Sequence, residues 1–294
     1  MKNRGLMITL IVFLSILAIS LIVLMVILLN GGFRNFNFIM FSSISENLAV
    51  EEEYQNPFRM IEVNSDASEI EIYSTEEKIT RVVIHGEEKN VTMTTNNDRL
   101  VIGTKMKCNF LCFGQKRSKV EIYLSKDYEG KIKVDNDYGN VTIGEFKNAT
   151  IEVEENCGDV KVVAGNEVKL DNDFGNIELD YAKHAELKDN AGKIKVGEVA
   201  DIKAENDLGD IRIGKVTNSL VIDEDCGDVI IDEVILAKDS SIKNDLGKIK
   251  IGFTNKIYID AETDLGKVKI NENARNADIT LRLENSCGDI IVDN

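Results

Sequence analysis

Three of the five cysteines in this 294-residue chain recur at one place in a repeated motif, and they are the first groups that could do chemistry. Cys157, Cys226 and Cys287 lie four and then three repeats apart. In stacked strands these separations are about 19 Å and 14 Å, too long for a disulfide, whose Cα atoms lie within about 7 Å. Leucine or phenylalanine takes the same place in other repeats. We therefore interpret these cysteines as small buried hydrophobic residues.

The other candidate nucleophiles and bases form no known catalytic pattern. Cys108 and Cys112 flank the tripeptide NFL, and the sequence leaves open whether they form a disulfide or stay as thiols. His85 and His184 stand alone, without a Ser-His-Asp or His-Glu-x-x-His arrangement around them. Carboxylate pairs could hydrolyse a polysaccharide, but 51 acidic residues produce such pairs by chance. We predict no catalytic residue and no cofactor, with a wall-polysaccharide enzyme as the alternative.

Aspartate and asparagine precede most of the repeated glycines, as in Asn172-Asp173 and Asn206-Asp207. Calcium-binding β-rolls also combine glycine and aspartate, but they use the pattern GGxGxDxUx. Here each repeat has one such glycine with an apolar residue before it, so the pattern favours structural turns. We predict no metal site, although acidic faces can attract cations weakly.

A basic and aromatic segment spans residues 103–119 in an otherwise acidic chain of net charge −16. Lysine and arginine near aromatic side chains suit the surface of an anionic membrane. The same segment could instead fold over the open end of a β-structure and cover its strand edges. The residues proposed for membrane or partner contact are Lys105, Lys107, Phe110, Leu111, Phe113, Lys116, Arg117 and Lys119.

The first element that would position these groups is an uncharged, mostly apolar run from Leu6 to Leu29. As a helix it would be about 36 Å long, enough to cross a hydrocarbon core of about 30 Å. It is too long for the apolar part of a signal peptide and lacks a small-residue cleavage site. Lys2 and Arg4 precede it, which predicts a cytoplasmic N-terminus and an extracellular remainder.

Nine copies of a short motif follow, each centred on a glycine with aliphatic residues two and four positions later. Another alternating pair precedes the glycine by seven and five positions, so each copy predicts two short strands around a turn. Copies of 17–22 residues predict a β-solenoid, with insertions confined to one connection. The residue just before the glycine is mostly apolar, which predicts that it points inward. The turn glycines are Gly139, Gly158, Gly175, Gly192, Gly209, Gly227, Gly247, Gly266 and Gly288.

Residues 57–134 contain less regular alternating strands, which predict irregular first rungs before the regular repeats of 135–294. A separate small β-domain is the alternative for this segment. Residues 1–30 would form the cytoplasmic N-terminus and the anchor. Residues 31–56 would form a stalk.

The order of an N-terminal membrane helix, a basic-aromatic excursion and many x-G-[DN]-[IV]-x-[IV] rungs resembles the bacterial putative-adhesin family with β-strand repeats, whose function is unknown. The membrane-anchored form is similar to LiaG-type proteins. This resemblance implies a right-handed β-solenoid at the cell envelope, beside envelope-stress systems, and implies no enzyme.

Taken together, the sequence predicts an all-β solenoid on a single-pass anchor in the cell membrane. It would act as a binding or scaffolding module for an unidentified envelope protein or polymer, or as a structural spacer. The acidic charge argues against a nucleic-acid partner, because phosphates would repel it.

Overall fold

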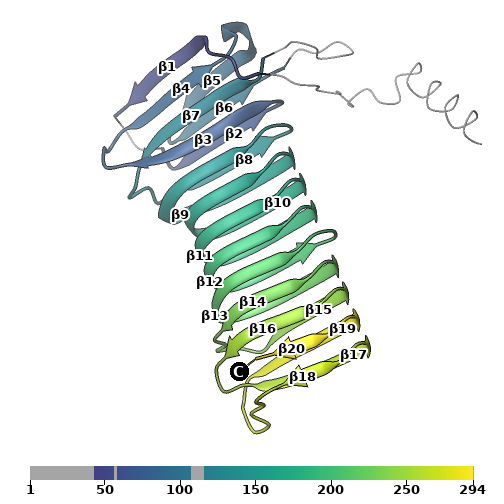
Figure 1. Ribbon diagram of the computed structural model, residues 1–294. Coiled ribbons are helices and arrows are strands. Elements are labelled where there is room, and N and C mark those ends of the chain that lie inside the picture. Colours follow the sequence, from purple (N-terminus) through teal and green to yellow (C-terminus); the bar gives the residue numbers. More distant parts are fainter. Residues whose placement is uncertain (1–42, 56–57, 107–115, 294) are drawn as a thin grey trace, which may run out of the picture. The chain divides into compact units, whose positions relative to one another are not determined.

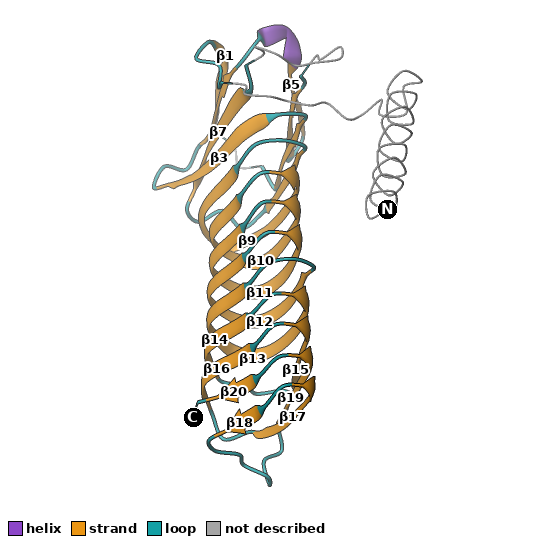
Figure 2. Ribbon diagram, turned by 45° about the vertical axis from the view of Figure 1, so that its right-hand side comes forward, coloured by secondary structure: helices purple, strands orange, loops and turns teal. Residues whose placement is uncertain are grey.

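The computed structural model describes residues 43–55, 58–106 and 116–293, and they form an all-β solenoid of about nine turns (Figures 1 and 2). Figure 1 shows the strands stacked as successive rungs. The predicted anchor, residues 6–29, lies outside the described residues. Within those residues, no helix combines the length and apolarity needed to cross a membrane.

Parallel strands build the regular rungs. A full-length strand starts after one turn glycine, crosses two faces of the solenoid and ends before the glycine of the next rung. Val160 of β10 pairs with Ile177 of β11, and the register continues to Phe174 and Ala191. The constant 17-residue offset therefore stacks each residue on its equivalent in the next rung. These strands are β8 (Lys131–Asn136), β9 (Val141–Cys157), β10 (Val160–Phe174), β11 (Ile177–Ala191), β12 (Ile194–Asn206) and β13 (Ile211–Cys226).

Insertions fall in one connection, as the constant spacing of the motif predicted. The β9–β10 pairing shifts register between Gly165 and Glu167, and the β12–β13 pairing shifts between Val199 and Asp201. Both shifts lie between the strand after one glycine and the strand before the next. The extra residues therefore leave the corner and the buried positions in register.

The last three copies do not stack in chain order. β15 (Ser240–Leu246) pairs with β19 (Thr280–Cys287), which in turn pairs with β17 (Tyr258–Leu265). The ninth copy therefore lies between the seventh and the eighth. The same order holds on the adjacent face, where β20 (Ile290–Val292) lies between β16 (Ile249–Thr254) and β18 (Val268–Ile270). β14 (Val229–Val234) joins β13 to β16.

The N-terminal end continues the stack with parallel strands and then covers it with antiparallel ones. β2 (Met60–Ser65) pairs with β8 and β6 (Arg99–Thr104), and β3 (Ser68–Thr75) pairs with β9 and β7 (Ser118–Ser125). β4 (Thr80–His85) runs antiparallel to β7, and β5 (Val91–Asn96) runs antiparallel to β6. A short 3₁₀ helix, η1 (Glu88–Asn90), precedes β5.

The stalk was predicted to extend too far toward the C-terminus. Leu48–Tyr54 form β1, which pairs antiparallel with β4 along its length. The alternation in this segment is weak because three consecutive glutamates, Glu51 to Glu53, occupy it. Pairing with the edge of β4, a tertiary contact, therefore decides its conformation.

Aliphatic side chains fill the interior along the stack except at its C-terminal end, where Val268 of β18, predicted to be buried, is 42% exposed. The positions predicted to be buried around the third glycine, Val168, Leu170, Ile177 and Leu179, are all at most 3% exposed. Alternation within parallel strands places such residues on one face, and stacking aligns them into continuous apolar columns.

Candidate interaction surface

A polar ladder occupies the inside of the glycine corner. The residue three positions before each glycine points inward, where the sequence pattern alone suggested no inward residue. Its members, in stacking order, are Asn136, Glu155, Asn172, Asp189, Asn206, Glu224, Asn244, Asn285 and Thr263. All except Thr263 are buried.

Hydrogen bonds to the neighbouring rung explain why asparagine suits this position. Asn172 donates through Nδ2 to the carbonyl oxygen of Gly158 at 3.2 Å, and Asn285 donates in the same way to Gly247 at 2.8 Å. Asn206 instead donates to Oε2 of Glu224 at 3.0 Å. The side chain thus binds the backbone that turns the neighbouring corner.

Burial raises the pKa of the acidic ladder members. Desolvation lifts the pKa of Glu155 and Glu224 to about 8 and that of Asp189 to about 7. At neutral pH the two glutamates are then mostly protonated and Asp189 is about half protonated. A protonated Asp189 then adds a donor beside Asn172, whose Oδ1 has no partner among the described residues.

The corner glycines fall into two conformations that follow the ladder and alternate as far as Gly247, whose neighbour in the stack, Gly288, shares its positive φ. Positive φ values of 131–147° occur at the five glycines with asparagine three positions before them. The other four follow Glu155, Asp189, Glu224 or Thr263 and lie outside that range. At both kinds of corner a Cβ would collide with backbone, as Gly209 would with the carbonyl oxygen of Gly192. Close stacking therefore requires glycine in every rung.

The residue just before each glycine points outward, so the prediction that it fills the corner was wrong. Phe174 is 63% exposed, Leu208 60% and Leu265 71%. The ladder residue already occupies the inside, and the chain then places two successive residues outside before it turns. The outward row, here called the apolar stripe, comprises in stacking order Cys157, Phe174, Ala191, Leu208, Cys226, Leu246, Cys287 and Leu265. Ala191 is half-buried and the other members are exposed, and Tyr138, half-buried before the first glycine, is not counted in the stripe.

The three cysteines of the apolar stripe are exposed free thiols, which corrects their interpretation as buried residues. The stacking order brings Cys226 and Cys287 closer than predicted, to two rung spacings or about 10 Å, because only Leu246 lies between them. This distance is still too long for a disulfide. Cys108 and Cys112 lie outside the described residues.

Charged and polar rows flank the apolar stripe. The residue before each stripe position forms one row, which includes Asp173, Asp207 and Asp225 and contains no cation. The residue after each glycine forms the other row, in which Lys193, Lys248 and Lys267 alternate with aspartate and asparagine. Side chains cap the backbone of the next rung along this second row, as where Asp228 accepts from the amide of Lys248 at 2.9 Å.

The basic residues proposed for membrane contact divide into two groups. Lys105 and Lys116 are exposed. Arg117 is half-buried, with its guanidinium 3.7 Å from Glu69 and 5.8 Å from the ring centre of Tyr138. Lys119 is also half-buried. Lys107, Phe110, Leu111 and Phe113 lie outside the described residues.

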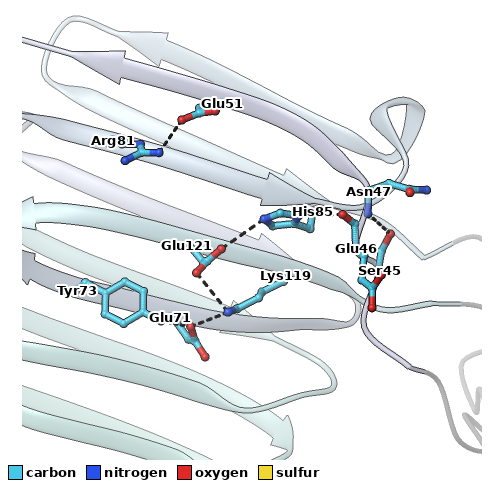
Figure 3. Close-up of polar contacts among 10 residues, drawn as sticks. All are labelled: Ser45, Glu46, Asn47, Glu51, Glu71, Tyr73, Arg81, His85, Lys119 and Glu121. Atoms are coloured by element: carbon cyan, nitrogen blue, oxygen red, sulfur yellow. Dashed lines mark hydrogen bonds and ion pairs between the residues drawn. The ribbon is translucent and has the colours of Figure 1, made fainter.

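Figure 3 shows Lys119 inside an ion-pair network on the outer face of β3, β7 and β4. Its Nζ lies 2.9 Å from Oε2 of Glu71 and 3.2 Å from Oε1 of Glu121. Burial alone would lower the pKa of Lys119, but hydrogen bonds to the two glutamates raise it above its ordinary value. His85 approaches Glu121 at 3.4 Å, and Arg81 binds Glu51 at 2.6 Å. The network joins strands that are distant in sequence.

A shallow groove of about 520 Å³ crosses β9 to β13 and contains His184, Asp201 and Ser219. His184 Nδ1 lies 3.0 Å from Asp201 Oδ2, and the Ser219 hydroxyl also donates to Asp201. Burial acts to raise the pKa of Asp201, but bonds from Ser219 and Asn218 hold it below its usual value. Because Ser219 binds the carboxylate and not the imidazole, the three residues do not form a nucleophilic triad.

Stacked rungs, a buried polar ladder and an exposed apolar stripe define a non-globular β-solenoid class of protein whose lateral surface is available for binding. A model of the family described as Toastrack DUF4097 matches residues 58–293, and the chain belongs to that family. No curated protein matches the chain.

Several solved structures are similar to the chain. A putative adhesin from Parabacteroides merdae is 13% identical with a TM-score of 0.48, over 86% of this chain and 98% of that one. A putative adhesin from Bacteroides fragilis is 16% identical with a TM-score of 0.44, over 86% of this chain and all of the other. A putative lipid binding protein from Parabacteroides distasonis is 11% identical with a TM-score of 0.42, over 85% and 98%.

Proposed function

We propose that the protein is a binding or scaffolding module, anchored in the bacterial cell membrane, whose solenoid lies outside the cell and binds an envelope partner through the apolar stripe. The stripe is the observation that carries this proposal. Phe174, Leu208 and Leu265 are each at least 60% exposed. Contiguous exposed apolar surface bordered by polar residues is typical of interaction sites.

The faces beside the stripe carry charged residues at outward positions, so the apolar row stands out from its surroundings. On the faces between corners, outward positions carry charged residues such as Lys169, Glu186 and Lys203. Charged residues ordinarily occupy the outer surface of a folded protein. A row of leucine, phenylalanine and cysteine along one corner therefore needs a reason other than folding, and a binding role supplies one.

The anchor and the extracellular topology are supported by the sequence, through the apolar run from Leu6 to Leu29 and the preceding Lys2 and Arg4. A link to envelope stress is supported by the family resemblance alone. Protease added to intact protoplasts should digest the solenoid while cytoplasmic proteins survive. Digestion only after lysis would overturn this topology.

Binding through the stripe is tested by affinity capture from solubilised envelope with the full chain. Phe174→Asp combined with Leu208→Asp should remove the captured partner. Phe253→Asp is the matched control, because Phe253 is 51% exposed on a different row. All variants should keep the wild-type melting temperature. Equal capture by all three forms would contradict the stripe as the binding surface and favour a spacer or another face.

A further inference from the structure

We propose that the partner of the apolar stripe is a second copy of this chain, aligned in parallel so that equivalent rungs face each other across a two-fold axis along the solenoid. This inference rests on the proposed binding role of the stripe and names its occupant. It follows from the order of charges beside the stripe.

The flanking rows distinguish the two ways in which identical stripes can meet. With the two-fold axis along the solenoid, the row before the stripe in one copy faces the row after the glycine in the other. With antiparallel copies, the row before the stripe faces itself. That row contains no cation, and antiparallel association centred on the stripe places Asp207 opposite Asp225. The row after the glycine also faces itself, which places Lys193 opposite Lys248 and Asp210 opposite Asp228.

Parallel association places cations opposite two aspartates of the row before the stripe. Lys248 faces Asp245, and Lys267 faces Asp264. Neither lysine has an ion pair among the described residues, so both ammonium groups are available to a second copy. Two rungs remain unfavourable, with Asp207 opposite Asp210 and Asp225 opposite Asp228.

The repulsion at one of these rungs is already reduced within each copy. Asp210 lies 3.6 Å from Lys193 and 3.5 Å from Arg212. Asp225 opposite Asp228 is therefore the main repulsive pair. This predicts that Asp225→Asn strengthens association, while Lys248→Glu with Lys267→Glu weakens it.

The dimensions of the stripe bear on the size of a dimer interface. Seven rung spacings of about 4.8 Å make the stripe about 34 Å long. A strip of that length reaches the roughly 800 Å² per partner of a standard interface if it is about 24 Å broad. The stripe with its two flanking rows spans three residue steps, about 10 Å of extended chain, and so supplies under half of that area, apolar at the centre and polar at the rim, as in a weak, reversible dimer.

The cysteines report the alignment directly. In a parallel pair, Cys157, Cys226 and Cys287 each face the same residue of the second copy. In an antiparallel pair centred on the stripe, Cys226 faces Leu208 and lies one rung from Cys226 of the second copy, whereas Cys157 lies one rung from Cys287. Links between two copies of Cys157 or of Cys287 therefore identify the parallel pair. A link between two identical cysteines is intermolecular by definition, because each chain has one of each.

The experiment uses the full chain in detergent with Cys108→Ser and Cys112→Ser, so that only stripe cysteines react with a short bifunctional maleimide. Peptide mapping should show Cys157–Cys157, Cys226–Cys226 and Cys287–Cys287 links, and sedimentation should show a dimer. Phe174→Asp with Leu208→Asp should weaken the dimer by about tenfold or more and remove the Cys157 and Cys226 links. Phe253→Asp should change neither.

Each other outcome overturns the parallel dimer. Cys157–Cys287 links in place of Cys157–Cys157 and Cys287–Cys287 links would show an antiparallel pair. A mixture of all combinations would show random collision. A dimer that survives the stripe variants without like links would be held by another part of the chain. If no dimer forms but stripe variants still lose an envelope partner in the capture experiment, the binding role stands and the second copy is wrong.

Discussion

The N-terminal end and the regular rungs avoid repulsion between charges on neighbouring strands in different ways. At the N-terminal end, antiparallel β1 and β4 bring a cation beside an anion where Arg81 meets Glu51, and β7 brings Lys119 beside Glu71 of β3. In the regular rungs, parallel stacking places equivalent residues beside one another, so identical charges would meet their own kind. Asparagine alternating with acid in the corner ladder avoids this repulsion, as between Asn172 and Asp189.

The two regions differ in where their polar interactions lie. The end of the solenoid holds its ion pairs at a partly exposed surface, where each contributes little. The regular rungs bury amides and carboxyls at the corner, where an unpaired group costs about 1–3 kcal/mol. We therefore expect the regular rungs to respond strongly to mutation and pH at the corner, and the N-terminal end to respond weakly.

The largest effect is expected for Gly209→Val in a regular rung. Gly209 has a φ of 147°, and a Cβ would collide with the Gly192 carbonyl. The loss of unfolding free energy should be of order 3 kcal/mol or more. Arg212→Gln, at an exposed position nearby, should cost less than about 0.5 kcal/mol. Urea unfolding of both variants checks this, and equal midpoints would disprove the stacked corner.

A pH dependence opposite to ordinary acid denaturation is expected from the ladder. Glu155 and Glu224 have folded pKa values of about 8, above the unfolded value of about 4.5. Their protonated form is favoured in the fold, so the stability that they contribute is complete below about pH 4.5 and is lost as pH rises to about 8. By linkage, each would account for at most about 5 kcal/mol over this range.

Glu224→Gln isolates this term from the general repulsion of an acidic chain. The variant should match wild type near pH 5 and exceed its melting temperature near pH 8.5, because an amide has no proton to lose. Glu186→Gln, an exposed change of the same charge, serves as control. A Glu224→Gln variant with the same pH slope as wild type would show that the ladder carboxyl is ionised in the fold.

A smaller effect is expected at the N-terminal end for Lys119→Gln. The change breaks contacts with Glu71 and Glu121, both half-buried. Loss should be about 1 kcal/mol, because the glutamates can regain water. Thermal melting of Lys119→Gln beside the exposed change Lys116→Gln measures it. A cost as large as that of Gly209→Val would contradict the contrast between the two regions.

The smallest effect expected is weak binding of residues 31–294 to anionic vesicles, reduced by salt. Replacing Lys105, Lys107, Lys116, Arg117 and Lys119 by glutamine should abolish it. Because Arg117 and Lys119 are already paired with glutamates, the Lys105, Lys107 and Lys116 changes should suffice. Co-sedimentation measures binding.

If residues 103–119 cover the end of the solenoid and do not contact a membrane, a different pair of results is expected. Replacing Phe110, Leu111 and Phe113 by serine would then lower the melting temperature, while wild type fails to sediment with vesicles at low salt. That pair of results would indicate that the segment covers the end of the solenoid.

The amino-acid sequence by itself determined the regular part of the fold, because two-residue alternation and a glycine every 17–22 residues leave few other ways to bury the aliphatic residues. It also located the insertions, which shift register at Gly165 and Val199 as the spacing requires. The family resemblance agreed with this fold.

Only the tertiary structure decided which side of the chain faces inward at the corner and how the final copies stack. Period-two alternation fails where Asp207 and Leu208 both point outward, and hydrogen bonds from Asn206 to the neighbouring rung decide this. The insertion of β19 between β15 and β17 depends on which edge was free to pair. The apolar stripe is therefore encoded in the sequence, but its exposure follows from contacts between rungs.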